Sequence, residues 1–396
     1  MIPTWIAPPL HRLATVLLTT AIVTLPGAAP AQVLYTIQDL GTLGGAVSSF
    51  GQGINAAGQV TGYSLTSGTP RAFRTTATGL VSDAGTDLGT LGGTFSVGSG
   101  INASGQVTGE TTTAGGASHA FRTTATGLVS DPGADLGALG FGRSVGTAIN
   151  ASGQVAGWYD RNINGNPYPQ AFRTTATGLL TDPGTDLGTL GGLTSRAGGI
   201  NAAGQVTGLS TTASGAQHAF RTSASGLVSD AGTDLGTLSG GTLSAGLAIN
   251  DSGQVVGYST TASGAQHAFR SSPNGQPVTL ADLGTLGGDG SVANSVNALG
   301  VLVGSSTITV GGSDSHAFVY DTQMRDLNAQ LVNGPGWILV SASSINDAGQ
   351  ITGWGTLNGQ THAYRLTPTL VPEPSALALA GFAFALWTAR KQSRRK

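Results

Sequence analysis

The chain has 396 residues, 64 glycines, no cysteine and only 9% charged residues, while 39% of its residues are hydrophobic. The lack of cysteine excludes disulfides and thiolate metal sites, and the low charge argues against a disordered chain. Between residues 32 and 371, 11 arginines stand against 17 aspartates and Glu110, which is a net charge of −7. This region lacks the basic footprint of a nucleic-acid-binding protein, so no nucleic-acid partner is expected.

Residues 1–31 have the three parts of a secretory signal peptide. Arg12 supplies positive charge, residues 13–25 are apolar, and Ala29 and Ala31 form a small-residue cleavage site. The prolines that follow the apolar stretch weaken the alternative of a buried N-terminal helix. We therefore expect a signal helix that is removed during export.

Residues 32–370 are filled by seven copies of one unit, each about 48 residues long. An Asp-Leu-Gly/Asn motif begins at Asp39, Asp87, Asp135, Asp186, Asp234, Asp282 and Asp326. An I/V-N-x-x-G motif begins at Ile54, Ile101, Ile149, Ile200, Ile249, Val296 and Ile345. An HAFR-like motif begins at Arg71, His119, Gln170, His218, His267, His316 and His362.

The unit reads as four short strands. The second unit shows them in order: residues 96–101, a turn at Asn102-Ala103-Ser104-Gly105, residues 106–109, the HAFR segment, and residues 135–139. Asparagine favours the start of a type I turn, and the closing glycine tolerates positive φ. Four strands in a repeat of this length are typical of one propeller blade.

The fold class predicted is therefore all-β, a seven-bladed β-propeller flanked by an N-terminal signal helix and a C-terminal hydrophobic helix. The repeat series begins with a fourth-strand motif at residues 35–43 and ends with a third-strand motif at residues 362–366. The N-terminal strand is therefore expected to complete the last blade, which removes exposed sheet edges. Small residues in the first strands suit a crowded axis. A β-solenoid with two coils per repeat is the alternative.

Two repeated sets of polar residues invite a chemical interpretation. The HAFR histidines could form a metal-binding ring, but their spacing places each in a separate blade, which favours a hydrogen bond within that blade. The HAFR arginines and the Asp-Leu-Gly aspartates predict a cross-strand ion pair, such as Arg122 with Asp135. Asp83 and Asp87, four residues apart, could contribute oxygens to calcium, or else serve turn hydrogen bonds. We expect no catalytic residues, no cofactor and no dedicated metal site.

The third unit breaks the repeat with its longest loop. That loop carries Trp158, Tyr159, Asp160, Arg161 and Tyr168 in a chain otherwise rich in Thr, Ser and Ala. Loops on a rigid scaffold often carry recognition. These residues are the candidate ligand loop, where aromatic rings could stack on a sugar, with gap-filling between blades as the alternative. Trp337 and Trp354 are interpreted as packing residues near the ring closure.

The C-terminal residues 371–396 resemble the PEP-CTERM sorting signal. Pro372-Glu373-Pro374 is followed by an apolar stretch from Ala376 to Trp387 and a basic terminus, although the stretch is short for a membrane span. The resemblance implies recognition by an exosortase after export, a membrane-inserted precursor with a short transmembrane helix, and delivery to the surface or exterior of a Gram-negative bacterium. An ordinary C-terminal membrane anchor is the alternative.

The repeat motifs resemble the bacterial extracellular HAF repeat family over residues 39–365. The resemblance implies a secreted repeat protein and carries no established ligand. We therefore expect a non-enzymatic surface or extracellular protein that binds or organises extracellular matrix or exopolysaccharide. Its expected partners are the secretion machinery, an exosortase and polysaccharide. The alternatives are a secreted propeller enzyme acting on extracellular polymer and a surface spacer without a ligand.

Overall fold

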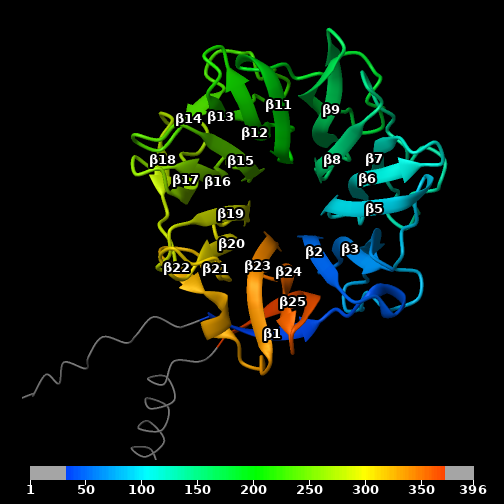
Figure 1. The fold of residues 1–396 in the computed structure, drawn as a ribbon, viewed down its shortest axis with the longest axis vertical. Helices are drawn as coiled ribbons and strands as arrows, with labels where there is room; N and C mark the ends of the chain where they lie inside the picture. The colour runs from blue at the N-terminus through cyan, green and yellow to red at the C-terminus, as the bar shows by residue number, and fades with distance from the viewer. Residues whose placement is uncertain (1–32, 371–396) are drawn as a thin grey trace, which may run out of the picture. The chain divides into compact units, whose positions relative to one another are not determined.

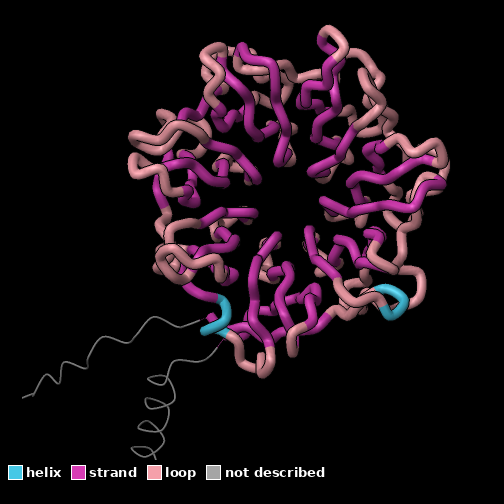
Figure 2. Tube along the Cα trace, in the orientation of Figure 1, coloured by secondary structure: helices cyan, strands magenta, loops and turns pink. Residues whose placement is uncertain are grey.

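The computed structural model describes residues 33–370, which form seven small antiparallel sheets in a ring (Figure 1). Strands and loops make up this region apart from two short 3-10 segments, η1 (Leu43–Gly45) and η2 (Leu327–Gln330) (Figure 2). The predicted seven-bladed propeller is confirmed. The signal peptide with Ala29 and Ala31, the sorting motif Pro372–Pro374 and both flanking helices lie outside the described residues. Within residues 33–370, no helix has the length and apolarity needed to cross a membrane.

The blades share one strand order, counted here from the channel outward. The first strands are β2 (Ser49–Ile54), β5 (Gly92–Ile101), β8 (Ser144–Ile149), β11 (Gly191–Ile200), β15 (Ser244–Ile249), β19 (Ser291–Val296) and β23 (Trp337–Ile345). The second strands are β3 (Val60–Thr66), β6 (Val107–Thr113), β9 (Val155–Ile163), β12 (Val206–Thr212), β16 (Val255–Thr260), β20 (Leu302–Thr307) and β24 (Ile351–Leu357). The third strands are β4 (Thr69–Arg74), β7 (Ser118–Arg122), β10 (Asn166–Arg173), β13 (Gln217–Arg221), β17 (Gln266–Ser271), β21 (Ser315–Tyr320) and β25 (Gln360–Leu370).

Full fourth strands are present in four of the blades. They are β14 (Asp234–Gly236), β18 (Leu280–Asp282) and β22 (Met324–Asp326) in blades 4 to 6, and β1 (Val33–Asp39) in blade 7. In blades 1 to 3 the Asp-Leu-Gly segment makes a single bridge to the third-strand phenylalanine, such as Phe121 with Asp135. The prediction of four strands per unit is thus right for blades 4 to 7 and too generous for the first three.

The ring closes through β1, which pairs with β25 in the last blade. Nδ1 of His362 lies 2.9 Å from Oδ1 of Asp39, and the Leu40 amide donates to the Ala363 carbonyl at 3.0 Å. The predicted closing strand is confirmed. The solenoid alternative is wrong, because the first and last repeats share one sheet.

Each blade is built on a buried aromatic ring that lies over a glycine. Third-strand Phe121 is fully buried, and so are its counterparts in the other six blades. A Cβ added at second-strand Gly109 would come within 2.9 Å of that ring and 1.8 Å of the Val97 carbonyl oxygen. Only glycine allows this approach, which explains the glycine that recurs as the third residue of each second strand. Burying one such ring contributes about 1.5–3 kcal/mol.

Candidate functional site

The I/V-N-x-x-G turns form a hydrogen-bonded collar at one end of the channel. Each keeps the predicted turn: Gly105 has φ +88°, and Oδ1 of Asn102 accepts the Gln106 amide at 3.0 Å. Each asparagine side-chain amide also donates to the main-chain oxygen of the next asparagine around the ring, at 2.9–3.3 Å. The collar runs through Asn55, Asn102, Asn150, Asn201, Asn250, Asn297, Asn346 and back to Asn55. The asparagines therefore join neighbouring blades by hydrogen bonds and also stabilise the turns in which they lie.

Two cavities occupy the channel. Isoleucine or valine side chains that precede the collar asparagines line one cavity of about 340 Å³, together with Asp251 and Asp347. A second, of about 360 Å³, is lined by Gln52, Ser99, Thr147, Asn294, Ser341, Ser343 and Trp354. Gln52, Ser99 and Thr147 are the unpaired residues of bulges in their strands. A bulge re-aims its side chain, so this cavity has neutral hydroxyl and amide walls.

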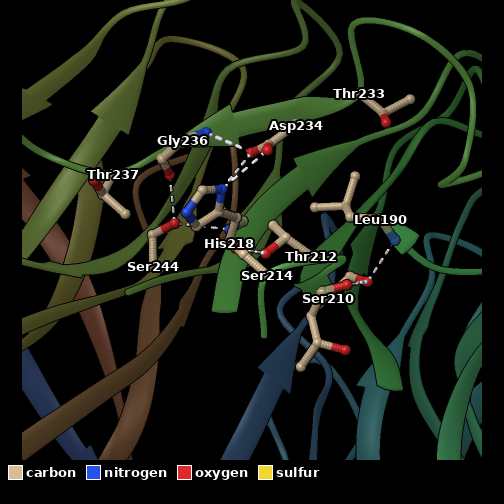
Figure 3. A network of polar contacts seen from close by, with 12 residues as sticks. Leu190, Ser210, Thr212, Ser214, His218, Thr233, Asp234, Gly236, Thr237 and Ser244 are labelled. Carbon is tan, nitrogen blue, oxygen red and sulfur yellow. Dashed lines mark hydrogen bonds and ion pairs between the residues drawn. The ribbon is translucent and has the colours of Figure 1, made fainter. Parts of the chain in front are cut away.

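The HAFR histidines pair with the Asp-Leu-Gly aspartates. In blade 4, Nδ1 of His218 lies 2.9 Å from Oδ2 of Asp234, which also accepts the Gly236 amide through Oδ1 at 2.8 Å (Figure 3). The equivalent pairs are His119–Asp135, His267–Asp282, His316–Asp326 and His362–Asp39. In blade 1, Arg71 takes the histidine's place and binds Asp87 at 3.1 Å. The interpretation of these histidines as hydrogen-bonding groups within their own blades is confirmed.

A serine of the next blade completes this polar network. The Ser244 hydroxyl donates to the Gly236 carbonyl at 2.5 Å (Figure 3). It also accepts the Ala219 amide at 2.7 Å. Six first-strand serines accept the HAFR alanine amide of the preceding blade in this way: Ser49, Ser96, Ser144, Ser195, Ser244 and Ser291. Blade 7 has Leu339 at this position, held instead by Asn328. The boundary between blades 6 and 7 therefore differs from the other six.

The predicted Arg–Asp ion pairs are wrong. The Arg122 guanidinium donates to the main-chain oxygens of Gly153, Thr175 and Gly178 in the next blade, at 3.0–3.3 Å. Strand alternation explains the error, because arginine points away from the face shared by the histidine and phenylalanine. Burial lowers the pKa of the equivalent arginines Arg74, Arg122, Arg173, Arg221 and Arg365 from their ordinary values. These arginines hold blades together.

The Asp83 and Asp87 carboxylates have separate partners. Asp83 accepts the Leu80 amide at 2.8 Å, while Asp87 binds Arg71 and the Gly89 amide. This is the turn alternative to calcium ligation. Across residues 33–370, no group of three or more His, Asp or Glu side chains is placed to hold a metal ion.

The candidate ligand loop of blade 3 divides into buried and surface residues. Tyr159 is only 5% exposed, and its hydroxyl donates to Oδ2 of Asp186 at 3.2 Å. Blade 3 has Gln170 at the position of the HAFR histidine, so the tyrosine makes the hydrogen bond to the aspartate that the histidine makes in other blades. Burial and the adjacent Asp186 carboxylate raise the pKa of Tyr159 to about 12. Asp160, Arg161 and Tyr168 lie on the longer hairpin of β9 and β10. The loop's binding role stays a prediction, but Tyr159 belongs to the core.

Trp158 lies between blades 3 and 4. The guanidinium carbons of Arg143 and Arg196 lie over its ring, 4.8 and 4.7 Å from the centroid. Arg143 also donates to Glu110 through Nε at 3.2 Å. The irregular loop pointed to Trp158, but nothing in the local sequence pointed to Arg143 or Arg196, which lie 15 and 38 residues away.

A groove of about 600 Å³ opens at the irregular boundary between blades 6 and 7. Its apolar lining includes Ile338, Val340 and Trp354, and its polar lining includes His316 and several hydroxyl groups. Val340 is the unpaired residue of an extra bulge in β23. The full lining is Ser305, Ile308, Ser313, Asp314, Ser315, His316, Ile338, Val340, Ser341 and Trp354. Ser341 and Trp354 also line the polar channel cavity, so groove and channel share a wall.

The two tryptophans of the last unit pack as expected, but one has a second surface. Trp337 lies edge-on to Tyr364, with ring centroids 6.1 Å apart. Trp354 lies edge-on to Phe50 of blade 1 at 5.5 Å and lines the groove as well. The signal for this site was the shortest repeat spacing, the 44 residues from Asp282 to Asp326. Comparison of the chain with protein-family models and with curated proteins finds no match.

Proposed function

We propose that the protein is a non-enzymatic carbohydrate-binding propeller that acts outside the cell, and that the groove between blades 6 and 7 is its ligand-binding site. The observation that carries this proposal is the composition of the groove. Blade 7 contributes Trp354, Ile338 and Val340 to the lining, while blade 6 contributes hydroxyl groups, Asp314 and His316. A sugar has apolar ring faces and hydroxyl edges, and these two kinds of lining residue match them.

Most residues that line the groove lie on strands, which favours a preorganised site. Trp354 lies in the register of β24 between Ser341 of β23 and Ala363 of β25. Nδ1 of His316 is fixed at 2.6 Å from Oδ2 of Asp326. A polysaccharide lying in the groove would reach the channel mouth at Ser341, where Asn294 and Ser343 offer further polar groups. Rigid walls reduce the ordering cost of binding.

The cellular setting proposed here rests on the two ends of the chain. The signal peptide pattern and the resemblance of Pro372-Glu373-Pro374 and its tail to a PEP-CTERM signal support export and exosortase-dependent sorting. On this proposal the propeller binds or organises exopolysaccharide at the surface or exterior of a Gram-negative bacterium.

The test is glycan-array binding by the purified full chain and by the variant Trp354→Ala. We expect the affinity of the variant to fall at least tenfold, because losing one aromatic contact costs about 1.4 kcal/mol of binding free energy. The matched control is Tyr258→Ala, because Tyr258 occupies the same register in blade 5, opposite Ala245 as Trp354 is opposite Ser341. Unchanged binding in Trp354→Ala would place the site elsewhere.

Two other outcomes would overturn the proposal. Depolymerisation of a bound glycan would favour the secreted enzyme. No binding to any glycan by the folded protein would favour the spacer without a ligand.

A further inference from the structure

Three arginines outside the repeat motifs lie in blades 3 and 4. Eleven arginines lie between residues 33 and 369, and six of them are the last residue of an HAFR motif. Arg71 and Arg325 form ion pairs with aspartates. The three that remain are Arg143, Arg161 and Arg196, and two of these meet over Trp158. An otherwise acidic propeller therefore places two arginines together at one blade boundary.

Both cations at Trp158 are exposed to solvent. Arg143 has 47% of its side chain exposed, and Arg196 is also an exposed residue. Each guanidinium carbon lies within 5 Å of the ring centroid, so the two charges lie within a Debye length, about 10 Å at 0.1 M salt. Glu110 neutralises one charge through Arg143, and no carboxylate of the described residues pairs with Arg196. The cluster keeps one uncompensated positive charge.

The cluster is held on regular backbone. Trp158 lies between Val145 and Ala171 in the sheet, and Arg196 lies opposite Leu209. The Arg143 carbonyl accepts the Asp160 amide at 3.0 Å. Stacking on an indole uses the face of a guanidinium and leaves its N–H groups pointing outward in the plane. Such N–H forks match the two oxygens of a carboxylate.

We propose that Arg143, Trp158 and Arg196 form a binding site for the carboxylate groups of an acidic polysaccharide. This rests on the proposed carbohydrate-binding function and gives it a substrate class, a polymer containing uronic acid. Glu110 orients Arg143 through an ion pair. That pair is itself an example of a carboxylate bound by the Arg143 guanidinium. Net negative charge elsewhere repels an anionic polymer, so attraction at this boundary directs how the polymer meets the ring.

The test is isothermal titration of the full chain with an oligogalacturonate, a neutral oligoglucan of equal length and a sulfated oligoglucan. We expect the oligogalacturonate to bind at least tenfold more tightly than either, with an affinity that falls as salt rises. The double variant Arg143→Gln and Arg196→Gln should lose this preference while keeping its affinity for the neutral ligand. Arg71→Gln is the control, because it removes one partly exposed arginine charge in blade 1, where Arg71 pairs with Asp87 and does not contact Trp158.

A second variant guards against a folding defect. Arg143→Lys with Arg196→Lys keeps both charges but loses the planar forks, so we expect an intermediate loss of about threefold or more at unchanged Tm. Equal binding of the sulfated ligand would overturn the carboxylate assignment. Full binding by the glutamine variant would overturn the site. If Trp354→Ala abolishes binding and the arginine variants do not change it, the proposed function stands and this inference fails. If the arginine variants abolish oligogalacturonate binding and Trp354→Ala does not change it, the groove proposal fails instead.

Discussion

Tyr159 and Gln170 show how one blade departs from the repeat by exchanging two residues together. Other blades place a small residue, Ser or Thr in five of them, opposite the first HAFR residue, whereas blade 3 places Tyr159 opposite Gln170. The tyrosine hydroxyl reaches Asp186 in the histidine's place. Gln170 is left fully buried, and neither of its amide atoms has a hydrogen-bond partner within the described chain. Such a group costs about 1–3 kcal/mol of stability.

The first prediction is that Gln170→Met stabilises the protein. Methionine has similar length and removes two unpaired polar atoms, so we expect a gain of about 1 kcal/mol in the free energy of unfolding. Chemical denaturation of both proteins measures the difference. Gln205→Met is the control, because Oε1 of Gln205 accepts the Asn201 amide at 2.9 Å and that variant should be less stable. A destabilised Gln170→Met would mean that the amide has a function in the fold.

Tyr159 gives the second prediction, a pH dependence of stability. Its pKa is raised from 10.0 to about 12, so the folded protein holds the phenol proton more tightly than the unfolded chain does. This contribution is complete below pH 10 and is lost as the pH rises from 10 to about 12. Tyr159→Phe should be less stable than the wild type at pH 8 by about 1–3 kcal/mol, because it loses the bond to Asp186. The gap should narrow between pH 10 and 12 in denaturation curves, and a constant gap would contradict the linkage.

Strands and blades are the scale at which sequence was most informative. The repeat anchors predicted the strand order, the collar turns and the closing strand, because strand length and turn chemistry are encoded locally. The His–Asp pairs were missed although the signal was present: His119 and Phe121 share a strand face, and Asp135 lies opposite Phe121. The collar bonds, the Arg143 and Arg196 contacts with Trp158 and the groove depend on how seven blades meet. No local pattern reports that geometry.

The hydrogen bonds between Ser244 and the preceding blade give the third prediction. Ser244→Ala leaves the Gly236 carbonyl and the Ala219 amide without their partner at a buried position. Figure 3 shows the bond from Ser244 to Gly236. We expect a loss of about 1–3 kcal/mol in the free energy of unfolding. Ser214→Ala is the matched control, because the exposed Ser214 hydroxyl bonds only to Thr212 and its loss should cost less than about 0.5 kcal/mol. Equal effects of the two substitutions would show that the hydrogen bonds between blades at Ser244 contribute nothing to the free energy of unfolding.

The whole ring depends on contacts that join its ends. The collar closes when Asn346 donates to the Asn55 carbonyl at 2.9 Å, and the last sheet closes when β1 joins β25. An open array of repeats can unfold from its ends, one unit at a time. A closed ring gives every blade two neighbours, so opening one boundary exposes two edges and weakens the collar as well. Closure should therefore make the stability of distant blades interdependent.

The fourth prediction tests that interdependence through β1. Ile37 is buried in the core of blade 7 with Tyr35 and Leu366, so Ile37→Asp buries a carboxylate and should release the closing strand. Amide hydrogen exchange should then rise in blade 4, on the far side of the ring, as well as in blade 7, because the collar and edges are shared. Thr36→Asp is the control, since Thr36 lies on the same strand but is not buried. Faster exchange confined to blade 7 would mean that the blades are stable individually, as in a linear repeat array.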